Sequence, residues 1–418
     1  MQLTAKLFCT VLALTFIVGQ PSLANDIQRN QAKRIHDRLT GVPATNAVIT
    51  TMESALAADS SGKSAAAIAI DPIQNPLNYS SFYNVTLKNF ATPWTNEEQT
   101  VFAPLNDYTA TVIGMIRDDV DFREILSGNI LYTGNNSPAY ANNSNAHYEA
   151  LENLGPVAGN LANTGILLAG DQTTFTGLPD SATAGVITSR AAAKSFFSDG
   201  TNRAMFRFTL INHLCTDLEP LKDISRTPDR IRQDVSRSPG GDSRIFINSC
   251  VGCHAGMDGM ASAYAYYEYD YTNDVEDGQL SYTPGSVQAK HLINPDNFKP
   301  GTIMTDDSWV NYWRNGQNGT LAVRTGSSGS GWTHPGEILD TKDNALGSGA
   351  KSLGIELANS KAFAQCQVDK VFRSVCFRDP NDKAADRTTR NTVVDAFVAG
   401  GYKMKQVFGD VAAACKGN

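Results

Sequence analysis

Hydrophobic residues recur at helical spacing along much of the chain. From residue 25 to residue 126, Ala, Val, Leu, Ile and Met stand three or four positions apart in short runs that Gly, Pro and Asn separate. That period is typical of an amphipathic helix. The runs, with two more beyond residue 185, predict helices at 28–39, 45–58, 63–70, 82–90, 108–116, 122–126, 189–197 and 201–214. The sequence therefore predicts a mainly α fold.

Two further stretches carry the signals of a helix start. Thr95-Asn96-Glu97-Glu98 places a capping residue before carboxylates, which the helix dipole favours in a first turn. Thr227 and Pro228 offer a cap followed by Pro at the first helical position. We expect a helix to begin at each.

Turn-forming residues replace the helical pattern between residues 128 and 185. Gly134-Asn135-Asn136-Ser137-Pro138 and the Asn-rich stretch 142–145 stand out. Such a stretch predicts a long loop, either a lid over a site or a solvated spacer. We expect a helical domain of unassigned role at 25–235, and a second domain with long loops at 236–418.

The first 24 residues read as a secretory signal peptide. Lys6 is followed by the apolar run 7–18 and by Gln20-Pro21-Ser22-Leu23-Ala24, a small-residue cleavage site. The run is too short to span a bilayer, so no transmembrane anchor is expected. Cleavage near Ala24 predicts a periplasmic or secreted protein.

The charge balance narrows the classes of partner. The 418 residues carry 35 Lys and Arg against 42 Asp and Glu, a formal charge of −7. Loss of Lys6 with residues 1–24 leaves 34 minus 42, or −8. An acidic chain is a poor binder of nucleic acid or of an anionic membrane surface.

The stretch from Phe246 to Met257 holds the strongest chemical signal. Cys250, Cys253 and His254 form C-x-x-C-H, the attachment motif of a c-type haem. Two thiols one helical turn apart can each form a thioether to a porphyrin vinyl group, and the adjacent imidazole can bind the iron as proximal ligand. Half of a zinc site is the alternative, but no second Cys-x-x-Cys or His-x-His accompanies the motif. We expect one covalently bound haem c with its iron, in a cytochrome-c-like domain at 236–418.

The sixth ligand to the iron decides between an electron carrier and a catalyst. The stretch 294–304, N-P-D-N-F-K-P-G-T-I-M, is similar to the loop of class I cytochromes c that presents an axial methionine. Met304 follows His254 by 50 residues, which suits a chain that wraps the porphyrin edge. Met304 is thus the expected distal ligand, and a thioether there raises the reduction potential. The alternatives are His291, an open site, and a Met304 that only fills the core.

Aromatic and basic residues near the motif could tune such a site. Trp309 and Trp313 are four apart, so on a helix they would share one face and could cover the haem or pack in the core. A dense set of tyrosines follows the motif, for which half-buried packing is the simpler expectation. A set of arginines precedes it and could neutralise propionates or form a solvated helix face. The tyrosines are Tyr264, Tyr266, Tyr267, Tyr269 and Tyr271, and the arginines are Arg226, Arg230, Arg232, Arg237 and Arg244.

Four cysteines remain once the signal peptide and the haem motif are set aside. They are Cys215, Cys366, Cys376 and Cys415, an even number in an exported chain. Four thiols allow three pairings. Cys366 with Cys376 is the preferred local pair, and four reduced core thiols are the alternative.

Three stretches resemble the planctomycete-type cytochrome c family, large secreted bacterial proteins with C-x-x-C-H between helical domains. They are R-I-H-D-R-L-T-G-V-P at 34–43, the segment 250–270 with its following Asp and aromatic-acidic run, and the closing stretch 363–408. The resemblance implies haem binding in the cell envelope. The longer members carry a further amino-terminal cytochrome module, whereas this chain has one haem motif.

Three functions fit these features. The favoured expectation is single-electron transfer to a redox partner protein by a periplasmic monohaem cytochrome. A haem enzyme with an exchangeable distal site, of peroxidase or oxidase type, is the second. A haem-bearing subunit of an envelope complex is the third.

Overall fold

The computed structural model describes residues 23–71, 81–198, 202–226, 229–230, 243–288, 303–315, 331–332 and 338–417. Helices dominate these residues, so the predicted mainly α fold is confirmed. The α-helices are α1 (Leu23–Thr40), α2 (Asn46–Ala58), α3 (Lys63–Ile70), α4 (Lys88–Ala91), α5 (Asp107–Arg117), α6 (Ala146–Asn153), α7 (Gly155–Ala158), α8 (Gln172–Thr176), α9 (Arg190–Phe196), α10 (Asn202–Leu214), α11 (Ser243–Ile245), α12 (Val251–Ala261), α13 (Gly349–Ala358), α14 (Lys361–Cys376), α15 (Ala384–Ala399) and α16 (Met404–Ala414).

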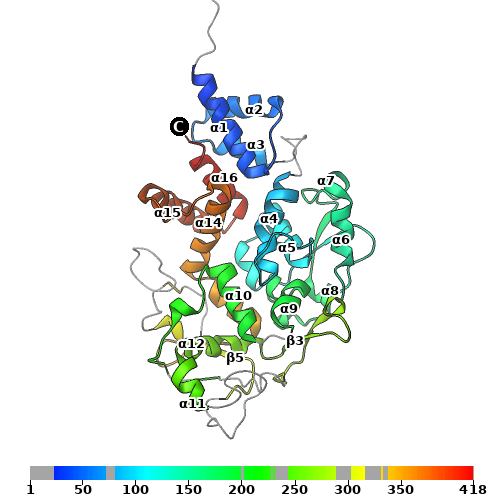
Figure 1. The fold of residues 1–418 in the computed structure, drawn as a ribbon, viewed down its shortest axis with the longest axis vertical. Coiled ribbons are helices and arrows are strands. Elements are labelled where there is room, and N and C mark those ends of the chain that lie inside the picture. The colour runs from blue at the N-terminus through cyan, green and yellow to red at the C-terminus, as the bar shows by residue number, and fades with distance from the viewer. Residues whose placement is uncertain are drawn as a thin grey trace, which may run out of the picture.

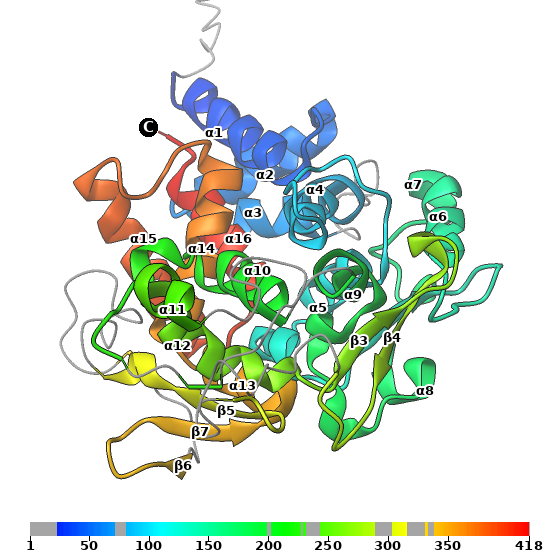
Figure 2. The same ribbon diagram turned by 60° about the horizontal axis from the view of Figure 1, so that its bottom comes forward.

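Short strands form three small antiparallel sheets in the described part of the chain. The first pairs β1 (Leu131–Gly134) with β2 (Leu167–Gly170), and the second pairs β3 (Tyr267–Asp270) with β4 (Gln279–Tyr282). The third has the order β5 (Ser308–Asn311), β7 (Ala345–Ser348), β6 (Ile338–Leu339). Figure 2 shows β3 and β4 beside α9, and β5 beneath α12.

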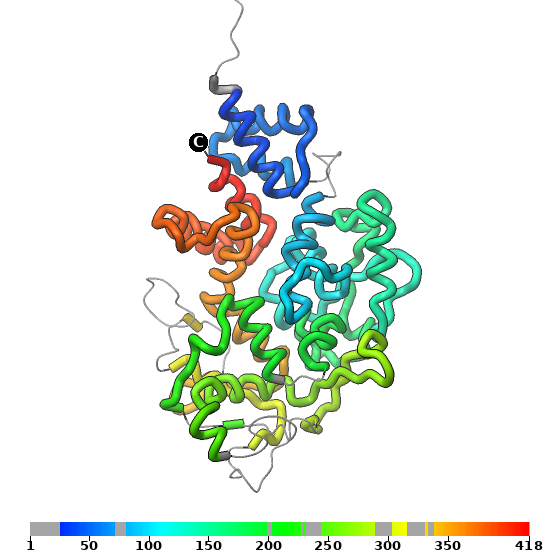
Figure 3. Tube along the Cα trace, viewed as in Figure 1, coloured from blue at the N-terminus to red at the C-terminus, as the bar shows by residue number. Residues whose placement is uncertain are grey.

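The helices at the two ends of the chain pack together. Helix α16 lies against α1 and α3, and Figures 1 and 3 show the red carboxyl-terminal helix beside the blue amino-terminal ones. Lys63 of α3 forms an ion pair with Asp410 of α16 at 2.7 Å. The Thr45 hydroxyl caps α2 by accepting from the Val48 amide. A single hydrophobic cluster joins these helices to the centre of the molecule.

Helix α5 is the buried centre of the fold, and all eleven of its residues are buried. Asn106 caps it by accepting from the Thr109 amide at 2.9 Å. The Asp107 carboxylate accepts from the backbone amides of Arg190 and Ala191, which fixes α9 against α5. A carboxylate buried in this way needs such donors, because an unpaired one would be costly.

Most of the helices expected from the apolar pattern are present. The helix expected at 82–90 begins as a π-helical stretch, η1 (Phe82–Leu87), and continues as α4. The helix expected at 122–126 is a 3₁₀ helix. The predicted start at Thr95 is wrong: a 3₁₀ helix, η2 (Thr92–Thr95), ends there, and the Asn96 side chain accepts from the Thr100 amide to close a turn instead. The expected start at Thr227 lies outside the described residues.

The segment 128–185, expected as one long loop, has structure of its own. It contains β1, β2 and the helices α6 to α8. The His147 ring accepts a hydrogen bond from the Gly134 amide at 2.8 Å. A side chain, rather than a neighbouring strand, therefore pairs with this amide at the end of β1. The predicted domain boundary near residue 235 falls outside the described residues and stays a prediction.

One disulfide ties α14 to the end of α10, and a second ties α14 to the end of α16. They join Cys215 to Cys366 and Cys376 to Cys415. The preferred pair Cys366–Cys376 is therefore wrong. Both residues lie on α14, where ten positions span about 15 Å, far beyond the Cα separation that a disulfide bridges. None of the described helices is both long and apolar enough to cross a membrane.

Candidate haem-attachment site

The C-x-x-C-H motif lies where a π-helical turn passes into an α-helix. Cys250 ends the π-helical stretch η7 (Phe246–Cys250), and Cys253 and His254 belong to the first turn of α12. Residues three or four apart lie on one side of a helix. Cys250, Cys253 and His254 are thus brought together on one turn, as the sequence predicted.

The two motif cysteines have a different bonding state from the other four described cysteines. Cys250 and Cys253 are half-buried and form no disulfide, with each other or elsewhere. Burial raises the pKa of the Cys253 thiol, and the nearby Lys222 ammonium opposes this. Two partly accessible thiols thus stand on one turn, and neither sulfur is engaged in a disulfide.

The histidine of the motif is held by a carboxylate one turn further along α12. His254 Nδ1 lies 3.0 Å and 3.1 Å from the two carboxylate oxygens of Asp258. An ionised carboxylate only accepts hydrogen bonds, so Nδ1 carries the proton and Nε2 keeps its lone pair. The Phe246 ring packs edge-on against the imidazole, with centroids 5.3 Å apart. The imidazole therefore has both a fixed tautomer and a fixed orientation.

A cation stands behind this carboxylate. Asp258 is 2% exposed, and Arg203 Nε of α10 lies 3.7 Å from its Oδ1. The Arg203 Nε is buried and has no hydrogen-bond partner among the described residues. The guanidinium offsets the cost of burying Asp258 without replacing its bond to His254.

Asp258 and Arg203 were not identified as site residues from the sequence. The signal for Asp258 was available, because an Asp four positions after His254 on a helix shares its face. Arg203 carries no such signal, since it reaches the motif only through the packing of α10 on α12.

Glycines let neighbouring elements approach the motif helix closely. A Cβ on Gly256 would lie 2.0 Å from Trp313 Nε1, and one on Gly259 would lie 3.0 Å from the Val310 carbonyl oxygen. The sheet strand β5 and the 3₁₀ helix η12 (Tyr312–Arg314) therefore pack directly on the α12 backbone. Near the start of α12, the Asp223 amide donates to the Gly252 carbonyl at 2.8 Å.

The expectation that Trp309 and Trp313 share a helix face is wrong. Trp309 lies on strand β5 and Trp313 in η12, although both are buried. Trp309 Nε1 donates to Ser352 Oγ at 2.7 Å, whereas the buried Trp313 Nε1 has no partner in the described part of the chain. Trp309 lies in a strand rather than a helix because its ring packs over Gly347, its partner residue in β7.

Met304, the expected distal ligand, is buried beside the motif rather than on it. Its neighbour Ile303 packs against Phe246, as Cys250 does, whereas Met304 packs with Ala265 and Tyr266. The segment around residue 303 thus reaches the motif, and the Met304 side chain enters a separate cluster. The rival His291 and most of the expected distal loop lie outside the described residues.

Four of the five tyrosines after the motif are buried and Tyr271 is exposed, whereas the described arginines before it are already engaged. Tyr267 and Tyr269 donate to the carbonyls of Ala182 and Val275. Arg226 pairs with Asp223 and Arg230 with Asp229. Arg232 and Arg237 lie outside the described residues.

The residues present fit a covalently attached haem. Two unpaired thiols can form the thioethers, and His254 offers Nε2 because Asp258 holds Nδ1. No group of three or more His, Cys, Asp or Glu in the described segments is arranged to hold a metal ion by itself. Comparisons with protein-family models, curated proteins and solved structures return no match for this chain.

Proposed function

We propose that this chain is an extracytoplasmic monohaem c-type cytochrome that transfers single electrons. One observation carries the proposal: of six described cysteines, four pair in disulfides, and the two that remain lie one turn apart beside a histidine of fixed tautomer. In an oxidising compartment two such thiols would be expected to pair unless another bond claims them.

Each residue of the motif has a separate role. Cys250 and Cys253 anchor the haem through thioethers, and His254 binds the iron through Nε2. Asp258 accepts a hydrogen bond from Nδ1–H, which fixes the orientation of the ring and raises the basicity of the imidazole. The bound haem supplies an iron that cycles between the ferric and ferrous states.

Met304 is our proposal for the sixth ligand, with His291 as its rival. Support for Met304 comes from Ile303, which packs against Phe246 and so brings this segment near the motif. A ligand role requires the Met304 side chain to leave the cluster that it forms with Ala265 and Tyr266.

The burial of Met304 in that separate cluster favours a second candidate function. If Met304 stays there and His291 does not bind, the sixth position remains open to small ligands. The protein would then be a haem enzyme of peroxidase or oxidase type rather than a carrier.

The location also belongs to the proposal. A signal-like segment at 1–24 and two disulfides support the periplasm or the exterior of the cell. There the electron partner would be another protein or a small redox molecule.

Optical and redox titration of the haem-loaded protein tests the two candidates. A carrier is low-spin in both oxidation states and binds carbon monoxide slowly. Met304→Ala should then give a high-spin site that binds carbon monoxide at once. The buried Met404, which lies on α16, serves as the matched control, and Met404→Ala should leave the spectrum unchanged. A wild-type protein that is already high-spin and binds carbon monoxide rapidly would contradict the carrier and support the enzyme.

A further inference from the structure

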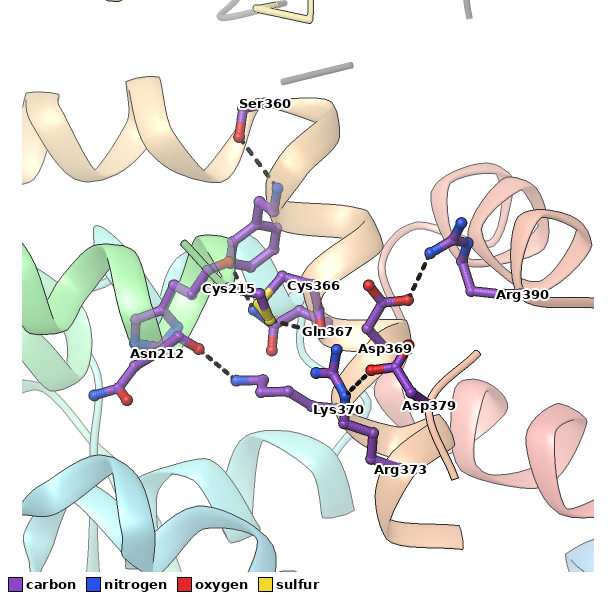
Figure 4. Close-up of a disulfide and its surroundings, with 12 residues drawn as sticks. Asn212, Cys215, Ser360, Cys366, Gln367, Asp369, Lys370, Arg373, Asp379 and Arg390 are labelled. Atoms are coloured by element: carbon purple, nitrogen blue, oxygen red, sulfur yellow. Dashed lines mark hydrogen bonds and ion pairs between the residues drawn. A yellow bond between two sulfur atoms is a disulfide. The ribbon is translucent and has the colours of Figure 1, made fainter. Parts of the chain in front are cut away.

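A second feature of the molecule lies away from the motif, between α10 and α14. A pocket of about 550 Å³ opens there, beside the disulfide that ties the end of α10 to α14. Figure 4 shows Lys370 of α14 beneath this disulfide, directed toward Asn212 of α10. The residues that matter for its chemistry are Trp94, Arg207, Phe208, Thr216, Lys370 and Arg373.

Lys370 is a partly buried cation without a counter-ion. Its Nζ donates to the Asn212 carbonyl at 2.5 Å and lies 3.2 Å from the centroid of the Trp94 ring. Among the described residues no carboxylate lies within ion-pair distance of it. A carbonyl dipole and an aromatic face stabilise an ammonium, but neither supplies a full negative charge.

The other charges of the pocket are already balanced or exposed. Arg207 forms two hydrogen bonds to Asp217, at 2.7 Å and 2.8 Å, and Arg373 pairs with Asp379 at 2.8 Å. Glu97 lines the pocket but is exposed to solvent. Lys370 is therefore the cation of this pocket whose charge is unmatched by the described residues.

The surroundings of Lys370 disfavour its charged form when the pocket holds no anion. Burial, and next the positive charge of Arg373, hold the pKa of Lys370 well below its usual value. The buried ring of His213, whose pKa burial also lowers well below its usual range, adds no negative charge. A bound anion would restore the ammonium and gain a charge-assisted hydrogen bond.

A hydroxyl in the same wall also has no partner. Thr216 is 7% exposed and lines the pocket, and its Oγ1 forms no hydrogen bond to any described residue. A buried hydroxyl left unpaired costs free energy that a ligand oxygen would recover. The pocket thus offers two donors, one charged and one neutral.

One part of the wall is apolar. Pro93, Phe208 and Ile211 line it together with Trp94. Phe208 is held in place by stacking on Phe196, with ring centroids 4.6 Å apart. Rigid apolar walls beside a few placed polar groups are typical of small-molecule sites.

We propose that this pocket binds a small organic carboxylate. Lys370 pairs with the carboxylate, Thr216 donates a hydrogen bond to it, and the apolar walls take the body of the ligand. The proposal does not depend on the haem, since every contact in it comes from α10, α14 and the residues that flank them.

Calorimetric titration of the full-length matured protein with benzoate and with benzamide tests the charge requirement. The two probes share a ring and differ in charge. We expect benzoate to bind and benzamide to bind at least tenfold more weakly, because a charge-assisted hydrogen bond contributes more than a neutral one. Equal binding of the two probes, or no binding of benzoate at about 10 mM, roughly ten-thousandfold above a micromolar Kd, overturns the proposal.

Substitutions of Lys370 and Thr216 test whether benzoate binds in this pocket. Lys370→Met should weaken benzoate binding by roughly ten- to a hundredfold, the loss expected for one charged contact. Lys361→Met is the matched control, since Lys361 is exposed on the same helix, and it should bind as wild type. Thr216→Val should weaken binding several-fold and serves if Lys370→Met fails to fold. Benzoate binding unchanged in the folded Lys370→Met protein, or in Thr216→Val, contradicts the assignment.

Discussion

Helices α12 and α14 each carry a pair of cysteines, and the structure treats the two pairs in opposite ways. On α14, Cys366 and Cys376 reach outward to Cys215 and Cys415. On the turn that begins α12, Cys250 and Cys253 stay unpaired. The spacing explains why Cys366 and Cys376 do not pair with each other, because ten residues along a helix hold their thiols far apart. It does not explain the free thiols of Cys250 and Cys253, which three residues bring to one side of the helix.

The acidic residues of the two helices also have different kinds of partner. An acid of α14 serves packing, since the buried Asp369 pairs with Arg390 of α15 at 2.8 Å. The acid of α12 serves a single imidazole, since Asp258 accepts from His254 and stands close to Arg203. The acid of α14 thus stabilises the packing of helices, whereas the acid of α12 orients the His254 imidazole.

Removal of the two motif thiols is expected to have the largest effect. Cys250→Ser with Cys253→Ser should abolish covalent haem, because no other described cysteine is unpaired. Haem staining of the denatured chain measures this. The comparison fails if the double variant still carries covalent haem, or if Cys376→Ser with Cys415→Ser loses it while remaining folded.

The disulfides should affect stability rather than haem content. By the loss of loop entropy, the link of Cys215 to Cys366 across 151 residues should contribute about 5 kcal/mol. The link of Cys376 to Cys415 across 39 residues should contribute about 4 kcal/mol. Denaturant unfolding of the two double Ser variants gives both values. A larger loss from the shorter loop would show that strain or packing, rather than chain entropy, sets the difference.

A single methyl group should have different effects at two positions along α12. Gly256→Ala places Cβ on Trp313 and should cost about 1–3 kcal/mol, the usual range for overpacking. Gly252→Ala is the control on the same helix, where the nearest atom is Ile224 Cγ2 at 3.3 Å and the gain in helix propensity offsets the contact. Thermal unfolding of the two variants compares them. Equal stability would mean that Trp313 does not pack on α12 as described.

The smallest expected effect concerns the tuning of the iron by Asp258. Asp258→Asn removes the charge behind His254, makes the imidazole a weaker donor and should raise the reduction potential by about 60 mV, a tenfold shift for one electron. Asp223→Asn, a buried acid beside Gly252 that does not contact His254, should change the potential far less. Redox titration of both variants distinguishes tuning from simple loss of charge. Equal shifts would assign the effect to charge alone.

The sequence predicted the helices better than the contacts between them. Runs such as 45–58 and 63–70 match α2 and α3 because burial repeats every turn and the caps are local. The start at Thr95 failed because the Asn96 side chain closes a turn, a choice that helical periodicity does not register. Trp309 failed because its strand partner, Gly347, is 38 residues away.

The candidate site was predicted in its local part only. Cys250, Cys253 and His254 lie within five residues of one another, so their arrangement follows from one helical turn. The pairing of Cys215 with Cys366 and the position of Arg203 depend on how α10 packs on α14 and α12. The resemblance to planctomycete-type cytochromes and the distal role of Met304 stay predictions.

The mass of the matured chain tests the central claim most directly. Protein made with intact export and haem-attachment machinery should have the mass of the chain from Asn25 plus one haem, less four hydrogens for the two disulfides. The added group should remain on the peptide that contains Cys250 and Cys253 after denaturation and digestion. A colourless protein whose mass shows no tetrapyrrole, or a disulfide between Cys250 and Cys253, would contradict the account.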